Sequence, residues 1–205
     1  MKRVAEDFEL LRRWREGDRE AGQELFARHF DALSRFFRNK VDDDAAADLL
    51  QTTFLACVER RDGFREDCSF RTFLFAVARR RLYSHFEGRM RDGGRFDPAA
   101  RSVVDLGTTP TQQIGLAQEH TLLLHALRSL PIELQALLEL HYWEHLAGPE
   151  LAIAFEVPEG TVRTRLRRAK QLLIERVAVL AGGSRPPSTE SDLDRWAADV
   201  RDRLG

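Results

Sequence analysis

The chain has 205 residues, a length that suits one medium domain or two small ones, and we predict two. Its 32 Lys and Arg residues balance 33 Asp and Glu residues, so the formal net charge is −1. This excludes a histone-like polycation, and any nucleic-acid surface must come from local segregation of charge. The sequence has no apolar run near the roughly 18 residues that a membrane span needs, and its N-terminus lacks the apolar block of a secretory signal. We therefore expect a cytoplasmic protein that does not insert into a membrane.

The two cysteines, Cys57 and Cys68, lie too far apart in the sequence for a CxxC metal or redox pair, and two are too few for a disulfide framework. We expect two buried thiols, with a redox-sensing role as a minor alternative. The sequence also lacks paired carboxylates, a nucleophile elbow and a glycine loop for phosphate. We therefore predict no enzymatic activity, no metal and no cofactor.

Helical periodicity runs through the first half of the chain. Apolar residues recur at spacings of three and four without sustained alternation, which predicts an all-α protein. A first strong helix is expected over about 20–40, and the aspartates at 42–44 can cap the next helix, which is amphipathic from Ala46 to Val58. Ser69 is a good N-cap for a third helix, which we expect to end near Gly88.

Glycine, proline and polar residues then replace the periodicity, which indicates a flexible linker. Leucine stripes resume beyond it, and three prolines are placed to begin helices there: Pro131, Pro149 and Pro158. A further Gly/Pro break precedes an amphipathic segment that ends near Leu204. The predicted organisation is a helical domain over 1–90, a linker over 91–117, a second helical domain over 118–180 and a tail over 181–205 that can hold a short helix.

The segment from Pro149 to Leu173 has the form of a helix-turn-helix. Apolar residues of its second helix leave one face open, and five cations occupy that face and its flanks: Arg163, Arg165, Arg167, Arg168 and Lys170. Like charges at this density repel unless a polyanion binds them, and a second helix of this kind fits the major groove of DNA. The alternative is a solvated amphipathic helix. Glu156 stands where the turn often has a small residue in a left-handed conformation, which predicts a shifted or strained turn.

The third predicted helix interleaves cations and rings. Arg71, Phe75, Arg79 and Tyr83 are spaced by four, and Phe64 lies in the preceding loop. Cations that track a backbone and exposed rings that stack on bases suit single-stranded nucleic acid. The alternative is that the rings fill a helical core. That alternative is the stronger one for Phe70 and Phe73, and it stays open for Phe64, Phe75 and Tyr83.

Two stretches together resemble the bacterial sigma factors of the extracytoplasmic-function (ECF) group, which keep only the region 2 and region 4 domains. They are DLLQTTFLACVERRDGFREDCSFRTFLFAVARRRL and ALRSLPIELQALLELHYWEHLAGPELAIAFEVPEGTVRTRLRRAKQLL. The resemblance covers about 20–90 and 120–178. It implies a factor that binds core RNA polymerase and directs promoter-specific transcription initiation, with an anti-sigma factor as a further candidate partner.

The resemblance also implies which residues meet each target. The residues implied to dock on the clamp coiled coil of the largest polymerase subunit are Asp48, Leu49, Gln51, Phe54 and Leu55. Those implied to melt and hold the −10 element are Phe64, Arg65, Ser69, Arg71, Phe75, Arg79 and Arg80. Those implied to read the duplex −35 element are Thr161, Arg163, Thr164, Arg165, Arg167 and Arg168. Thr52 and Val58 stand where the family commonly has an acid and a tryptophan, so polymerase docking is expected to be weaker or to use other contacts.

Two other functions are to be weighed. His141, Glu144 and His145 spell an inverted zinc-protease pattern, but no distal acidic ligand stands out and the helix-turn-helix follows directly. An ordinary helix-turn-helix regulator that acts without polymerase would explain the second domain equally well. It would not need the basic, aromatic surface of the first domain. For the tail our hypothesis is that its apolar stripe packs on the two domains or on a partner and modulates activity; the alternative is a disordered, mildly acidic extension.

Overall fold

In the computed structural model, residues 2–64, 67–89, 96–107 and 118–181 are described, and within them the chain is all-helical with a single isolated bridge, Ser102 to Pro131. This confirms the predicted fold class. The helices are α1 (Lys2–Arg15), α2 (Arg19–Arg38), α3 (Asp43–Glu59), the short 3-10 helix η1 (Arg61–Gly63), α4 (Phe70–Arg89), α5 (Gln118–Arg128), α6 (Ile132–Tyr142), α7 (Gly148–Phe155) and α8 (Glu159–Leu180). The predicted tail helix lies outside the described residues.

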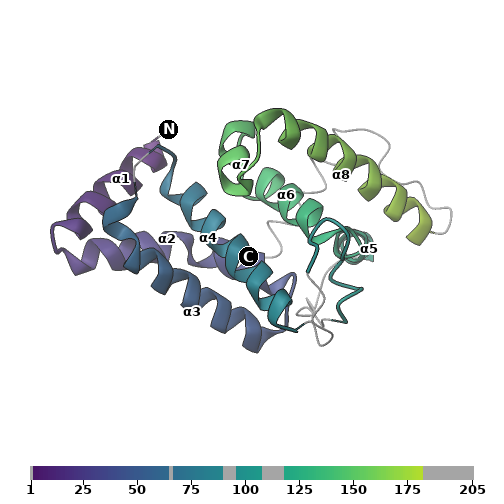
Figure 1. Cartoon of the computed structure of the whole chain (residues 1–205), viewed down its shortest axis with the longest axis horizontal. Coiled ribbons are helices and arrows are strands. Elements are labelled where there is room, and N and C mark those ends of the chain that lie inside the picture. The colour runs from purple at the N-terminus through teal and green to yellow at the C-terminus, as the bar shows by residue number, and fades with distance from the viewer. Residues whose placement is uncertain (1, 65–66, 90–95, 108–117, 182–205) are drawn as a thin grey trace.

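Helices α1 to α4 form the first module, on the left of Figure 1. The predicted caps are present: the Asp42 carboxylate accepts from the Ala45 amide at 2.9 Å, and the Ser69 hydroxyl accepts from the Thr72 amide at 3.1 Å. Helix α1 was not predicted as a helix. Its buried face packs on α2 through Leu10, Leu11 and Trp14.

Helices α5 to α8 form the second module, on the right of Figure 1. Its own core joins α5, α6 and α8 through leucines together with Trp143, Ala169 and Val177. Pro149 and Pro158 lie at or next to the first residues of α7 and α8, as predicted, since proline fits where no helical N–H partner is needed. None of the described helices is both long and apolar enough to cross a membrane.

Residues 96–107 correct part of the linker prediction, because they are packed between the modules and not a free coil. Phe96 and Val103 are buried, and the Phe96 ring lies 5.4 Å from that of Phe86. The Ile132 amide donates to the Arg101 carbonyl at 2.9 Å, and the Glu133 amide donates to the Pro98 carbonyl at 3.0 Å. This segment therefore fixes the start of α6 against the end of α4.

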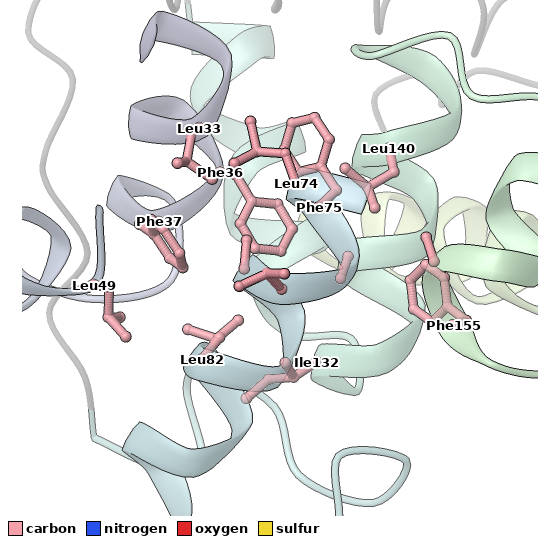
Figure 2. Close-up of a cluster of buried hydrophobic side chains, with 14 of the residues drawn as sticks. Leu33, Phe36, Phe37, Leu49, Leu74, Phe75, Leu82, Ile132, Leu140 and Phe155 are labelled. Carbon is pink, nitrogen blue, oxygen red and sulfur yellow. The ribbon is translucent and has the colours of Figure 1, made fainter. Parts of the chain in front are cut away.

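The two modules share one hydrophobic core. Figure 2 shows side chains from α2, α3 and α4 meeting Ile132 and Leu140 of α6 and Phe155 of α7. Every labelled side chain in that view is buried. The expectation of two loosely tethered modules therefore differs from the structure, in which α7 lies directly against α4. The periodicity showed which helix faces are apolar, but it did not show that faces from the two modules cover each other.

Candidate nucleic-acid interface

The cationic face of α8 is built by its apolar spacing. Val162, Ala169 and Leu173 are buried against the second module, which turns the intervening arginines outward. Arg163, Arg167 and Arg168 are exposed, and the Arg163 side chain retains 82% of its accessible surface. The Arg163 guanidinium forms an ion pair with Glu159 at a long 3.4 Å. These cations are therefore available to a polyanion, as predicted.

Two threonines near the start of α8 take different positions. Thr161 is half-buried, whereas Thr164 is exposed and donates its hydroxyl to the Gly160 carbonyl at 3.0 Å. Both lie in the first turns of the helix, where unpaired amides and the helix dipole favour anions.

Arg165 differs from the other predicted −35 residues. Its guanidinium is directed to α6, where it forms an ion pair with Glu133 at 2.6 Å, and its side chain is largely buried. The spacing alone placed it with the outward cations. The structure gives it a role in holding α8 against α6, so a direct contact of Arg165 with DNA would require that pair to break.

The turn between α7 and α8 has the strain that the sequence indicated. Glu156 adopts a left-handed backbone with φ of 58° and ψ of 41°, a conformation that costs a non-glycine residue about 1 kcal/mol or more. Its carboxylate accepts from Arg80 and, at 2.7 Å, from Arg79. Hydrogen bonding from Arg80, together with the positive charge of both arginines, lowers the pKa of Glu156 below its usual value. The strained residue is therefore also an acceptor for the basic helix of the other module.

Helix α4 brings the predicted −10 cations to α7. Arg79 is buried, and its Nε donates to the Ala154 carbonyl at 2.9 Å. Its guanidinium also lies over the rings of Tyr83 and Phe155, at 5.2 and 5.6 Å. Ser69 is half-buried and donates to Glu150 at 3.1 Å, while Arg71 is half-buried. Arg65 lies outside the described residues.

The positions of two aromatic rings, Phe64 and Phe75, contradict their predicted role in binding the −10 element. Phe75 has no exposed surface and packs edge-on to Phe36, with 5.6 Å between ring centroids. Phe64 is buried against Phe73 at 4.8 Å. The alternative of a helical core is therefore right for both rings, because neither is exposed to stack on an unpaired base.

Comparison with known proteins covers both modules. Residues 25–92 match the family model "Sigma-70 region 2", and residues 120–173 match "Sigma-70, region 4". The ECF RNA polymerase sigma-E factor of Haemophilus influenzae is 23% identical over 85% of this chain and 96% of its own length. That of Escherichia coli K12 is 25% identical over 85% and 95%. The chain belongs to the ECF group of sigma factors. It is thus a transcription initiation factor, and the match over region 2 removes the support for a regulator that acts alone.

Solved structures agree with the fold of this sigma factor. CnrH, solved in complex with the cytosolic domain of CnrY, has a TM-score of 0.61 and 26% identity, covering 87% of this chain and 99% of that one. RpoE of Bartonella quintana, solved with the anti-sigma factor NepR, has a TM-score of 0.58 and 22% identity over 80% and 98%. The second likeness concerns the fold alone.

The surface that the resemblance assigns to polymerase lies on α3 of this sigma factor. Asp48, Gln51 and Leu55 are exposed, and Phe54 is half-buried. Leu49 is buried in the shared core, which corrects its assignment as a docking residue. The sequence interpretation missed Phe30 of α2, which is exposed with its ring 6.5 Å from that of Phe54. Its position on the apolar face of 20–40 was the available signal, but periodicity treats such a residue as core.

The structure of this sigma factor bears on two minor alternatives, a redox role for the two thiols and a zinc site at His141, Glu144 and His145. Burial raises the pKa of Cys57 to about 12 and that of Cys68 to about 11, so both thiols are protonated at neutral pH. Glu144 forms an ion pair with Arg35 of α2 at 2.9 Å. Within the part of the chain that the structure describes, no group of three or more His, Cys, Asp or Glu side chains is arranged to hold a metal.

Proposed function

We propose that this sigma factor reads a duplex −35 element through the outward face of α8. The observation that carries the proposal is the segregation of charge: a chain of net charge −1 presents Arg163, Arg167 and Arg168 together on one exposed helix face. Thr161 and Thr164 lie at the same end of the helix, where they can contact phosphate. An arginine bound to a guanine edge gives about 1–3 kcal/mol of discrimination per good contact.

We assign the binding of the −10 element to α4 and the loop that precedes it. The groups that support this part are Ser69, Arg71, Arg79 and Arg80, and Arg65 of the loop joins them from the sequence alone. The exposed face of α3, with Asp48, Gln51, Phe54 and Leu55, is assigned to the clamp coiled coil of the largest polymerase subunit. Exposed apolar side chains next to polar ones are the composition expected of a protein-binding surface.

A regulatory protein of the anti-sigma class is a further partner in this proposal. CnrH, the similar sigma factor named above, was solved with the cytosolic domain of CnrY. The place of action is the cytoplasm, where polymerase and promoter DNA are found. No catalytic step is assigned to the chain, because initiation chemistry belongs to the polymerase.

Run-off transcription tests the proposal. The purified chain is mixed with core polymerase and with promoters selected from genomic DNA by sequencing of the bound fragments. We expect specific transcripts that disappear with Leu55→Asp, whereas Val179→Asp, which charges another exposed apolar residue at the far end of α8, leaves them intact. Stable duplex binding without any polymerase-dependent transcript would overturn it.

A further inference from the structure

A separate apolar cluster joins α1 to the turn that precedes α4. Its buried members come from α1, from α2, from that turn and from the first residue of α4: Leu10, Leu11, Trp14, Ala21, Leu25, Phe64 and Phe70. The turn consists of residues 61–64, that is η1 and its C-cap Phe64, and we call it the η1 turn. The Phe64 ring lies 6.5 Å from the ring of Phe70 and 4.8 Å from that of Phe73. The η1 turn is therefore anchored through its side chain on the inner side.

The last residue of α1 holds the backbone of the η1 turn. The Arg15 guanidinium donates twice to the Arg61 carbonyl, from Nε at 3.1 Å and from Nη2 at 3.0 Å. The same Nη2 also donates to the Phe64 carbonyl. One planar cation thus joins the first carbonyl of the turn to the last, and hydrogen bonds from a guanidinium are strong and directional.

Trp14 fixes the place from which Arg15 reaches the turn. The indole is buried, its ring lies 5.1 Å from that of Phe26 in α2, and the Arg61 guanidinium lies over it at 5.3 Å. Helix α2 approaches the indole closely at Gly22, where an added Cβ would come within 2.6 Å of the ring. The end of α1 is therefore packed tightly on α2, and Arg15 extends from a fixed backbone.

The η1 turn leads directly to the groups assigned to the −10 element. Arg65 follows Phe64 in the sequence, and Ser69 then caps α4 through the Thr72 amide. Selective binding of an unpaired base requires its contacts to be held within about 0.5 Å, and a loop achieves this only when rigid elements support it. Helix α1 supports this turn in two ways, through the apolar cluster and through the guanidinium of its last residue.

We propose that Arg15 is a positioning residue for −10 recognition: its guanidinium fixes the backbone of the η1 turn and so helps to set which bases of the −10 element this sigma factor accepts. Arg15 acts through the turn and does not itself contact DNA. The proposal rests on the proposed function of α4 and its preceding loop. It gives a part in promoter selectivity to α1, which lies before the matched region 2 at residues 25–92.

The hydrogen bonds and the apolar cluster can be separated by substitution. Arg15 is half-buried and lies outside the cluster, so replacing its guanidinium leaves the contacts of Leu11, Trp14 and Phe64 in place. The fold then persists, while two carbonyls of the turn lose a charged donor. A purely stabilising role of Arg15 would affect the free energy of unfolding without changing which promoter is chosen.

The test uses the full chain and two substitutions at one position. Arg15→Gln removes the charge and the paired donors, whereas Arg15→Lys keeps the charge as a compact ammonium without the planar fork. Arg12→Gln is the matched control, because it makes the same change one turn earlier on α1, where the arginine pairs with Glu9 and Glu16. Arg15→Lys against Arg12→Lys repeats the comparison with the charge retained, and this pair serves if Arg15→Gln does not fold.

The first measurement is hydrogen exchange of the Gly63 amide in the free chain. This amide donates to the Arg60 carbonyl at 3.1 Å, so its exchange reports opening of the turn. We expect exchange roughly tenfold faster in Arg15→Gln than in Arg12→Gln, because a hydrogen bond from a charged group shifts an opening equilibrium by that order. Arg15→Lys should fall between them. Equal exchange in Arg15→Gln and Arg12→Gln would overturn the proposal.

The second measurement is promoter selectivity of the polymerase holoenzyme. A promoter that gives run-off transcripts is prepared with each of the other bases at each −10 position, and rates of open-complex formation are compared. We expect the preference for the original base to fall by roughly three- to tenfold at one or more positions in Arg15→Gln, since a well-placed contact to a base gives discrimination of this order. Arg15→Lys should restore part of the preference. Arg12→Gln should retain it, and affinity for a duplex −35 element should be the same in all variants.

The outcomes distinguish this proposal from the proposed function. Specific transcripts with the same base preferences in Arg15→Gln and Arg12→Gln would overturn the positioning role, even if Arg15→Gln were less stable. A wild-type chain that yields no run-off transcripts would contradict the proposed function. In that case exchange of the Gly63 amide would still show whether Arg15 holds the turn.

Discussion

Arg79 of α4 and Glu156 of the helix-turn-helix lie 2.7 Å apart, although 77 residues separate them in the sequence. The pair joins a residue assigned to the −10 element to a residue in the strained turn of the helix-turn-helix, the module that we propose reads the −35 element. Because Arg80 shares the same carboxylate, a single acid of one module forms ion pairs with two cations of the other.

The first prediction concerns pH. The pKa of Glu156 in the folded chain lies below its usual value, so its contribution to the packing of α7 on α4 is present above that usual value and is lost as the pH falls through the lowered pKa. We expect the radius of gyration to rise as the pH is lowered below the usual range for a glutamate and this carboxylate takes up a proton. Glu156→Gln should remove that part of the change. Identical scattering profiles for the two chains across this range would contradict the prediction.

A second prediction separates core packing from base stacking at Phe75. Because the ring is fully buried beside Phe36, Phe75→Ala should lower the free energy of unfolding by about 3–5 kcal/mol. Phe75→Leu should lower the free energy of unfolding by less. At temperatures where the chain is folded, it should leave the binding of a single-stranded oligonucleotide unchanged. Urea unfolding and fluorescence anisotropy make the two measurements. A stable Phe75→Ala variant with weakened oligonucleotide binding would restore the ring to the DNA surface.

How far the sequence predicted this fold depends on the kind of interaction. Local signals were reliable: Asp42 and Ser69 cap the helices that they were expected to cap, and Glu156 has the left-handed turn geometry that its position indicated. These features depend on neighbours within a few residues. Helix α1 was missed because its apolar residues, Leu10, Leu11 and Trp14, make only a short stripe whose burial requires α2.

Contacts between the modules were beyond sequence reasoning. An arginine on a helix face looks the same in the sequence whether solvent, DNA or an acid far along the chain faces it, so Arg165 and Arg79 could not be told from Arg163. The same holds for Phe64 and Phe75, whose burial depends on helices that pack over them. The candidate −35 face was predictable because it depends on one helix and its own spacing.

The third prediction concerns the thiols. With the pKa of Cys57 raised to about 12 and that of Cys68 to about 11, the reactive thiolate is scarce at pH 8 in the folded chain. A thiol-directed colorimetric reagent should therefore react slowly with both cysteines in buffer and rapidly with both in denaturant. Cys68 should react first, because it is half-buried whereas Cys57 is buried. Rapid labelling of the folded chain, or a disulfide formed under mild oxidant, would revive a redox role.

The last prediction divides the arginines of α8 into two classes. Arg163 is exposed, so Arg163→Ala should change the free energy of unfolding by less than about 0.5 kcal/mol. The same change should weaken binding to a duplex −35 element and reduce the slope of log affinity against log salt by about 1, as expected for one lost phosphate contact. Arg165→Ala should instead lower the free energy of unfolding and leave the salt slope of duplex binding nearly unchanged. It leaves the largely buried Glu133 without its partner and loosens α8 from α6.

The comparison is made by chemical unfolding and by duplex binding at several salt concentrations, with Arg176→Ala as an exposed control later on α8. If Arg163→Ala and Arg165→Ala gave the same salt slope and the same loss of stability, the assignment of one arginine to DNA and the other to the α6–α8 contact would fail. If Arg165→Ala destabilises the chain while Arg163→Ala weakens duplex binding, the two roles on α8 are separated by residues two positions apart. That separation follows from the helical period, which turns neighbouring odd-numbered positions through about 200° and so faces one arginine to solvent and the other to α6.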